Sequence, residues 1–263
     1  MLIDFHTHAF PEKIAEAAIS KLADASGGLI PQTDGTVSGL KKRMEEEGTD
    51  LSVVLSIATN PRQQTKVNDF AIWMNSVEGI AAFGSVHPEA PDALSELERI
   101  KAAGLKGVKL HPEYQQFYVD DERMKPIYKK ISSLGLITLF HAGDDYGYPP
   151  PYHCLPENML KALKWFDSPV IAAHWGGLGR AEEVLDKLCG TDIYFDTAFG
   201  YATMYKGFAQ QIVEKHTPDK ILFGSDMPWH SPTMEKCLIE SLDLSSEDRE
   251  KIYFKNAEKL LKI

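Results

Sequence analysis

The sequence predicts a closed (β/α)8 barrel followed by an extra helix at its C-terminal end. Eight short apolar runs alternate with longer segments of helical spacing, and no hairpin turn joins two neighbouring runs. Alternation of this kind predicts a parallel sheet, because the chain must cross over a helix before the next strand begins. The length of 263 residues suits eight such units in one barrel domain that spans residues 1–263.

The predicted strands are the short apolar runs, most of which end beside a polar residue. In chain order they are Leu2–His6, Leu51–Ile57, Ile80–Val86, Gly107–His111, Leu136–His141, Val170–His174, Asp192–Thr197 and Lys220–Asp226. An open sheet that binds a dinucleotide would carry a GxGxxG turn after a strand, and the sequence has none. A closed barrel is therefore favoured over an open doubly wound sheet.

Helices are expected between these strands. The segments with helical spacing lie near residues 61–77, 91–103, 120–133, 156–166, 178–188, 203–216 and 232–241. The first crossover, residues 11–47, is longer and should hold two helices around a turn at 27–35. The last helix, near 245–261, begins with Ser245 and Ser246 ahead of Glu247, which is typical of a helix N-terminus.

Composition narrows the class of partner. The chain has 28 basic and 38 acidic side chains, a formal net charge of -10, which argues against nucleic acid or an anionic membrane as its partner. Its three cysteines form neither a disulfide framework nor a CxxC motif, and no apolar run is long enough for a signal peptide or a membrane span. We expect a cytoplasmic protein that acts on a small molecule; whether it forms a homodimer is left open.

Polar residues gather at the predicted strand ends, where the chemistry of a barrel takes place. Seven of the nine histidines lie at or beside such an end. The polar set comprises His6, His8, His87, Lys109, His111, His141, His174, Asp196, Asp226 and, just past the last strand, His230.

Residue alternation indicates which of these side chains point inward. In the first strand, His6 and His8 share one parity with Asp4, and Ile3 and Phe5 have the other. If the two apolar residues face the helices, both imidazoles point into the barrel mouth. By the same argument the side chains of Lys109 and His111 point inward. It also puts Ala172 on the same face as His174, and Gly224 on the same face as Asp226.

Three imidazoles and one carboxylate would make a metal site of borderline hardness. His6, His8, His141 and Asp226 form such a set, which suits one divalent ion: zinc first, with manganese, iron or cobalt as alternatives. An ion with an open coordination position lowers the pKa of bound water to about 7. A carboxylate not fully committed as a ligand, such as that of Asp226, can take the proton.

Five motifs occur in a fixed order between residues 4 and 261: DFHTH, FHAG, AHWGG, FGSDMP and NAEKLL. On these motifs the chain resembles the amidohydrolase superfamily, in particular the amidohydrolase-2 branch with its aminocarboxymuconate-semialdehyde decarboxylase-like enzymes. The resemblance implies metal binding at His6, His8, His141 and Asp226. It also implies that His174 is an acid/base or substrate-polarising group and not a ligand.

The fourth strand leaves an alternative open. Two-metal members of the superfamily often carry a carbamylated lysine there, and Lys109 occupies the matching position. The branch resembled here usually holds one metal, so we expect Lys109 and His111 to contact substrate, with a role at a second ion as the alternative. A ligating histidine also needs an acceptor for its other ring nitrogen, and Asp4 is a candidate.

Substrate selection is expected from the loops. The segment Gly143–Pro156 follows His141 directly and should form one wall of the pocket, through Tyr152 or His153; the alternative is a rigid connector. Arg62 and Arg180 are candidates for pairing with a substrate carboxylate, or else are surface arginines.

The sequence thus predicts a metal-dependent hydrolase that uses an activated water on a small, carboxylate-bearing substrate. The runner-up is a metal-dependent decarboxylase of an unsaturated or aromatic carboxylic acid, because the branch resembled holds both chemistries. The third hypothesis is a barrel that binds a metal or a ligand without catalysing a reaction. No ligand position is lost, which speaks against it.

Overall fold

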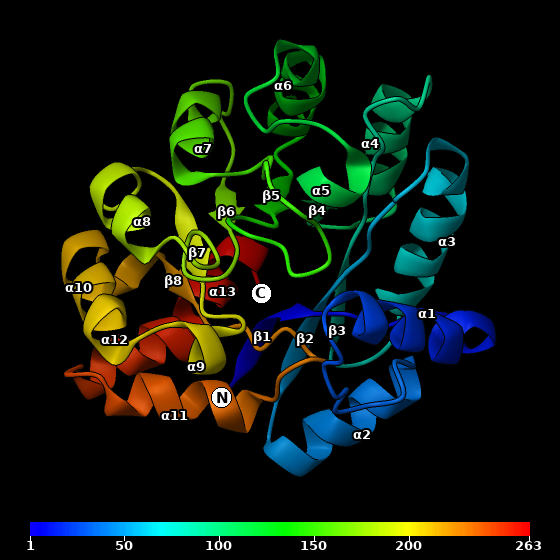
Figure 1. Cartoon of the computed structure of the whole chain (residues 1–263). Helices are drawn as coiled ribbons and strands as arrows, with labels where there is room; N and C mark the ends of the chain where they lie inside the picture. Colours follow the sequence, from blue (N-terminus) through cyan, green and yellow to red (C-terminus); the bar gives the residue numbers. More distant parts are fainter.

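Eight parallel strands surround a central axis, with the helices outside them (Figure 1). The computed structural model describes residues 1–263. The strands are β1 (Ile3–Thr7), β2 (Leu51–Leu55), β3 (Ile80–Phe83), β4 (Gly107–Leu110), β5 (Ile137–Phe140), β6 (Val170–Ala172), β7 (Tyr194–Asp196) and β8 (Ile221–Leu222). Each lies within or across a predicted run, so all eight strands are confirmed.

The barrel closes through two seams. Regular pairing gives one sheet in the order β1-β2-β3 and another in the order β4-β5-β6-β7-β8. Between β3 and β4, the Gly84 N–H donates to the Gly107 carbonyl at 3.0 Å and the Lys109 N–H donates to the Gly84 carbonyl at 2.8 Å. Between β8 and β1, the Phe5 N–H donates to the Phe223 carbonyl at 2.8 Å. These bonds join the two sheets, as the barrel prediction requires.

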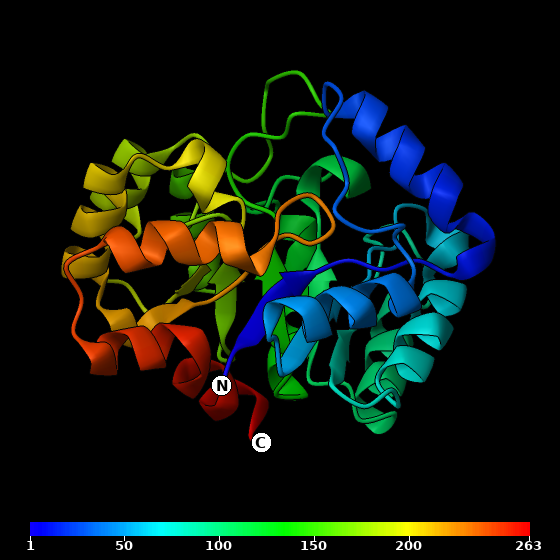
Figure 2. The same ribbon diagram turned by 90° about the horizontal axis from the view of Figure 1, so that it is seen from below.

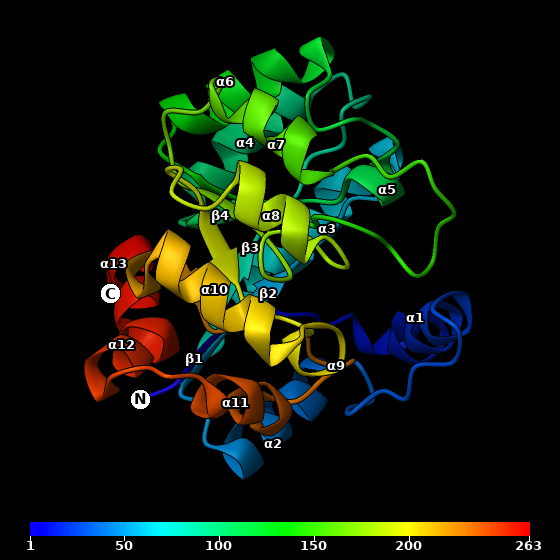
Figure 3. The same ribbon diagram turned by 60° about the vertical axis from the view of Figure 1, so that its left-hand side comes forward.

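The expected helices are present. They are α1 (Glu12–Ala25), α2 (Val37–Glu47), α3 (Gln64–Met74), α4 (Ala93–Ala102), α6 (Lys125–Ser133), α7 (Pro156–Leu163), α8 (Ala181–Lys187), α10 (Lys206–His216) and α11 (Pro232–Ser241). Among them α8 and α10 lie side by side on the outside of the barrel (Figure 3). None of the helices is both long and apolar enough to cross a bilayer.

Short helices also occur; the 3-10 turns at Pro61–Gln63 and Glu122–Met124 lie inside predicted helical segments, and the other short helices were not predicted. The four-residue helices α5 (Pro112–Gln115) and α9 (Gly200–Thr203) follow β4 and β7, and single 3-10 turns lie at Pro61–Gln63, Glu122–Met124 and Pro218–Lys220. One turn of helix is too short to show a 3.6-residue periodicity, which explains why the sequence pattern misses it.

A helical segment seals the end of the barrel opposite the loop that follows β5 (Figure 2). It runs through α12 (Ser246–Glu250), a π-helical turn (Lys251–Lys255) and α13 (Asn256–Leu261). The Ser245 Oγ accepts the Asp248 N–H at 3.1 Å, so the predicted N-terminus of this segment is confirmed. Asn256 Nδ2 donates to the Ile221 carbonyl at 2.8 Å and fixes the segment to β8.

Two apolar layers form the core. The larger one lies between strands and helices, and the smaller one fills the barrel with side chains from β1, β2, β3, β5, β6 and β8 above α13. Ile3 and Phe5 belong to the inner layer, so the expectation that they face the helices is wrong. The reason is a break in the pairing register of β1 between Asp4 and Thr7, which ends strict alternation and lets His6 point inward as well.

Candidate metal centre

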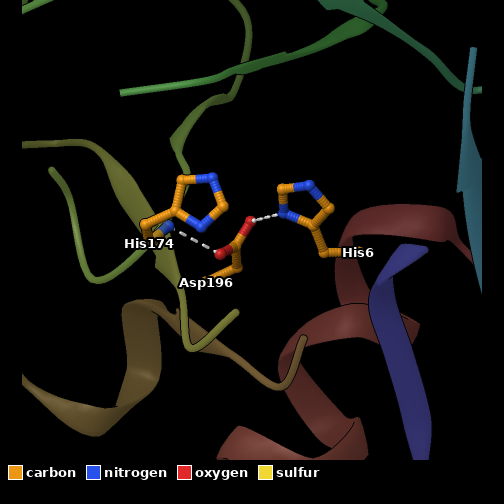
Figure 4. Close-up of side chains that lie close together, drawn as sticks. All are labelled: His6, His174 and Asp196. Carbon is orange, nitrogen blue, oxygen red and sulfur yellow. Dashed lines mark hydrogen bonds and ion pairs between the residues drawn. The ribbon is translucent and has the colours of Figure 1, made fainter. Parts of the chain in front are cut away.

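The end of β7 supplies a buried carboxylate that joins two histidines (Figure 4). Asp196 Oδ2 accepts a 2.8 Å hydrogen bond from His6 Nδ1, and Asp196 Oδ1 accepts a 2.9 Å bond from the backbone N–H of His174. Burial opposes the charge on this carboxylate, but the neighbouring His6 outweighs it and holds the pKa of Asp196 below its ordinary value. The sequence marked Asp196 only as a polar strand end and gave it no role.

His6 and His8 direct their second ring nitrogens toward one carboxylate oxygen. His6 Nε2 lies 3.4 Å and His8 Nε2 lies 3.2 Å from Asp226 Oδ1. His8 Nδ1 donates to the Leu55 carbonyl at 3.0 Å, as His6 Nδ1 donates to Asp196, so each neutral ring carries its lone pair on Nε2. Two lone pairs that face a carboxylate oxygen repel it unless a cation lies among them. The donors of His6, His8 and Asp226, here called the first cluster, therefore fit a divalent metal ion.

Asp4 does not act as the acceptor for a ligating histidine. Its carboxylate accepts hydrogen bonds from the Ser225 N–H at 2.9 Å and the Ser225 Oγ at 2.5 Å, and burial raises its pKa to about 7. The suggestion that Asp4 supports a ligand is therefore wrong. Asp196 and the Leu55 carbonyl do so instead, because barrel closure brings them against the Nδ1 side of the two rings.

Asp226 and His174 leave their strands in the left-handed backbone region. φ is 69° at Asp226 and 59° at His174, a conformation that costs a non-glycine residue about 1–2 kcal/mol. Ala172 lies in the outer apolar layer, so plain alternation would send the His174 ring outward, and the left-handed turn directs it inward. The prediction that the Ala172 and His174 side chains share one face is thus wrong, because Ala172 faces outward and His174 faces inward. Gly224 does face inward, toward His6.

Asp226 is held as a carboxylate. Burial acts to raise its pKa, but the neighbouring His6 and His8 rings hold the pKa of Asp226 well below its ordinary value. The side chain can therefore accept a proton or bind a cation.

His174 and His141 are hydrogen-bonded through their rings. His174 Nε2 lies 3.1 Å from His141 Nδ1, and His174 Nδ1 lies 3.2 Å from the Ala198 carbonyl. A carbonyl only accepts, so His174 Nδ1 carries a proton, and a neutral His174 ring then keeps its lone pair on Nε2, which faces His141 Nδ1. Burial, then the neighbouring His141, lowers the pKa of His174 to about 3. The ring is a neutral hydrogen-bond acceptor in this arrangement.

His141 forms a second cluster with His111 and Asp145. The two imidazoles are stacked with centroids 4.3 Å apart, and their Nε2 atoms lie 3.5 Å (His111) and 3.7 Å (His141) from Asp145 Oδ2. His141 Nε2 also lies 3.0 Å from the Asp144 carbonyl. To join the first cluster at a metal, His141 must give up one of its ring contacts, so its role as the fourth ligand stays a prediction. Asp145 was not singled out in the sequence because no periodic pattern marks a loop carboxylate.

Lys109 faces the first cluster, as the alternation predicted. Its Nζ lies 3.5 Å from His6 Nε2, the side chain is buried, and burial lowers its pKa to about 8. The same strand turns His111 inward, where burial and then His141 lower its pKa well below the ordinary value.

Of the four residues predicted to contact substrate from the loops, one is exposed and three bind neighbouring parts of the protein. Arg62 is exposed in the 3-10 turn after β2 and forms no ion pair. Arg180 donates to Asp144 at 2.6 Å, and its guanidinium carbon lies 5.8 Å from the centroid of the Tyr152 ring. The His153 N–H donates to Glu113 at 2.6 Å. None of the four predicted contacts (Arg62, Tyr152, His153, Arg180) thus joins the two histidine clusters.

The first half of the loop Gly143–Pro156 does lie at these clusters. Besides Asp145, it supplies Tyr148, whose ring lies 5.4 Å from Tyr114, and Tyr114 stacks on His111 at 3.8 Å. Tyr146 meets Phe199, which follows β7, at 6.0 Å. The loop side chains that contact aromatic residues around the centre are therefore Tyr146 and Tyr148, and Tyr152 and His153 fasten the second half to neighbouring elements.

Comparison with known proteins places this geometry in a family. A family model described as amidohydrolase matches residues 3–263. No curated protein matches the chain in sequence.

Solved structures with the same fold share little sequence with the chain. A TIM-barrel protein from Bordetella bronchiseptica has a TM-score of 0.78 at 18% identity, covering 99% of this chain and 98% of its own. A dihydroxybenzoic acid decarboxylase from a Polaromonas species, with bound manganese and 2-nitroresorcinol, has a TM-score of 0.72 at 16% identity, with 99% and 96% covered. A proposed 2-pyrone-4,6-dicarboxylic acid hydrolase from Pseudomonas putida has a TM-score of 0.69 at 15% identity, with 99% and 97% covered.

These likenesses confirm the (β/α)8 barrel, and the family match covers nearly the whole chain. Barrel, histidine-rich strand ends and family model agree, and the chain belongs to the amidohydrolase family.

Proposed function

We propose that the chain is a metal-dependent hydrolase of a small, carboxylate-bearing substrate. One observation carries the proposal: the Nε2 atoms of His6 and His8 converge on Asp226 Oδ1 while both Nδ1 atoms are held by acceptors. His6, His8 and Asp226 would hold one divalent ion, with His141 as the fourth ligand. Zinc is the first choice for three imidazoles and a carboxylate. Manganese is the alternative, because the Polaromonas relative binds it.

Two residues of the chain would handle protons. A bound ion would supply Lewis acidity, which lowers the pKa of water and polarises a carbonyl group. Asp226, held in its charged form by His6 and His8, can accept a proton from the attacking water. Once His141 turns away as the fourth ligand, the Nε2 lone pair of His174 would hold that proton next or orient the leaving group.

Decarboxylation of an aromatic or unsaturated acid is the second candidate. The manganese-containing Polaromonas relative is a decarboxylase of an aromatic acid. That reaction requires a proton to be given to carbon, and His174 would be the donor. Since His174 Nδ1 is bonded to the Ala198 carbonyl and Nε2 acts as an acceptor, the ring as placed suits proton uptake better than proton donation.

The test measures turnover by protein whose metal content is controlled. The purified chain would be stripped with a chelator, reloaded with zinc or manganese, and screened against aryl lactones, N-acyl amino acids and hydroxybenzoates. Release of acid and release of carbon dioxide would be followed in parallel. We expect acid release that requires the ion and is lost in the His8→Gln variant.

His216→Gln is the matched control, because His216 is a buried histidine outside both clusters whose ring bonds only Gly190 and Ile193. Carbon dioxide as the only product would show that the reaction is decarboxylation and not hydrolysis. Equal turnover with and without metal would refute the metal-dependent function.

A further inference from the structure

His230 is a buried histidine that the proposed function does not use. It follows β8 in the loop that begins at Asp226, and its Nδ1 lies 2.6 Å from Glu235 Oε1 on α11. Its ring stacks on Phe199 with centroids 4.1 Å apart and an interplanar angle of 20°. The hydrogen bond and the stacking contact together fix the position and the orientation of the imidazole ring.

Glu235 is itself held in place. The carboxylate is buried, and its Oε2 accepts the Tyr201 N–H from α9 at 2.9 Å. The only side chain on its Oε1 is His230, so α9 and α11 together orient the imidazole. A buried carboxylate behind an imidazole fixes which ring nitrogen faces outward.

His230 Nε2 is a hydrogen-bond donor when the His230–Glu235 pair holds one proton more than the single proton of a neutral ring. If the pair is ionic, the imidazolium has protons on both nitrogens. If the pair is neutral, the protonated Glu235 donates to Nδ1 and the remaining ring proton sits on Nε2. Burial raises the pKa of Glu235 to about 7, which favours keeping that proton within the pair. Both of these states present an N–H at Nε2, whereas ionised Glu235 beside a neutral ring protonated on Nδ1 would not.

Nε2 of His230 has no partner in the protein and is not sealed from solvent. His216 provides the contrast within this chain, because it also stacks on a phenylalanine, Phe195, with a centroid distance of 4.1 Å and an angle of 20°. The backbone of Gly190 and that of Ile193 occupy both of its ring nitrogens. A histidine with a structural role alone is fully bonded here, whereas His230 keeps one ring nitrogen free.

The residue with the free ring nitrogen is joined to the candidate metal centre by a short turn. The Trp229 N–H donates to the Asp226 carbonyl at 2.8 Å, so a tight turn joins His230 to the first cluster. On the other side, Phe199 follows Ala198, whose carbonyl accepts from His174 Nδ1. Short stretches of backbone therefore link His230 to the ligand Asp226 and to the carbonyl that accepts from His174.

We propose that His230, oriented by Glu235, is a specificity-determining residue that binds a second carboxylate of the substrate, away from the metal ligands. The inference rests on the proposed function, because it names the substrate class of that site: a dicarboxylic acid or its ester, amide or lactone. A carboxylate is the acceptor that gains most from a fixed N–H donor backed by a buried acid. Glu235 is a positioning residue that acts through His230.

The test compares mono- and dicarboxylate binding to zinc-loaded protein by calorimetry. Benzoate is the one-carboxylate probe, and phthalate, isophthalate and terephthalate add a second carboxylate at three spacings. We expect one diacid to bind about tenfold tighter than benzoate, the gain of one charge-assisted hydrogen bond. His230→Asn keeps a donor for Glu235 but removes Nε2, so it should abolish this advantage and leave the benzoate affinity unchanged. His230→Gln, with a distal amide, should restore part of it.

His216→Asn is the control and should retain the full diacid advantage. The Nε2 proton of wild-type His230 should appear in histidine-ring 15N spectra, and Glu235→Gln should shift its signal. A diacid advantage that survives in His230→Asn, the lack of any diacid advantage in the wild-type protein, or an unprotonated Nε2 would each overturn the inference. The proposed function fails separately, when removal of zinc leaves benzoate binding and turnover unchanged.

Discussion

His6 Nδ1 donates a 2.8 Å hydrogen bond to Asp196 Oδ2, a residue 190 positions further along the chain, and both side chains are buried. This bond fixes the tautomer of His6 so that the Nε2 lone pair faces Asp226. The carboxylate behind the imidazole therefore decides whether the first cluster is ready to bind a cation.

Asp196→Asn should weaken metal binding by about 10–100-fold, because an amide nitrogen at the Oδ2 position cannot accept the His6 proton. The amide oxygen can still accept the His174 N–H, so the fold should persist. Zinc affinity would be measured by competition with a chromogenic chelator. Asp186→Asn, which removes only an ion pair with Lys187, is the control. Equal affinity in both variants would show that Asp196 does not support a ligand.

His174→Asn should lower kcat by about 10²-fold or more while the protein keeps its metal, because the ring is proposed to move a proton without being a ligand. Metal content by mass spectrometry and turnover of the best substrate would be measured on one preparation. Loss of the ion would instead make His174 a ligand. Unchanged kcat would leave Asp226 as the only acid/base group.

Gly143→Ala should destabilise the protein more than Gly104→Ala, although φ is 88° at both positions. A Cβ at Gly104 meets nothing within 4 Å, so that change should cost about 1 kcal/mol for the left-handed backbone. A Cβ at Gly143 would overlap the backbone of Leu178, which adds about 1–3 kcal/mol. Urea unfolding of both variants gives the difference. Equal losses would mean that the loop after β5 adapts without strain.

Glu235→Gln should remove a pH dependence of stability. Burial raises the pKa of Glu235 from 4.5 to about 7, so the folded protein binds more protons than the unfolded chain between these values. The contribution of Glu235 to the free energy of unfolding is therefore full below about pH 4.5 and falls as the pH rises to about 7.

The measurement is the difference in free energy of unfolding between wild type and variant near pH 5 and near pH 7.5, which should be smaller at the higher pH. Glu16→Gln, at an exposed residue of α1, should give no such trend. A difference that grows with pH would mean that Glu235 is ionised throughout this range.

The sequence by itself determined the barrel and its strand ends. Apolar runs, helical spacing and the Ser245 N-cap depend on residues a few positions apart, and such local patterns persist whatever the rest of the chain does. The histidine pair His6 and His8 and the strand-end residue Asp226 were likewise recognisable, because strand ends of a parallel barrel must meet at one face.

Only the tertiary structure decided which partners these residues have. Asp196 supports His6, His141 contacts His174, and Arg180 pairs with Asp144, all through contacts between separate strands and loops. Alternation could not predict them, because a register break in β1 and a left-handed turn at His174 override it. A hydrogen bond depends on distance and angle in space, and residues far apart in the chain acquire these only when the barrel closes.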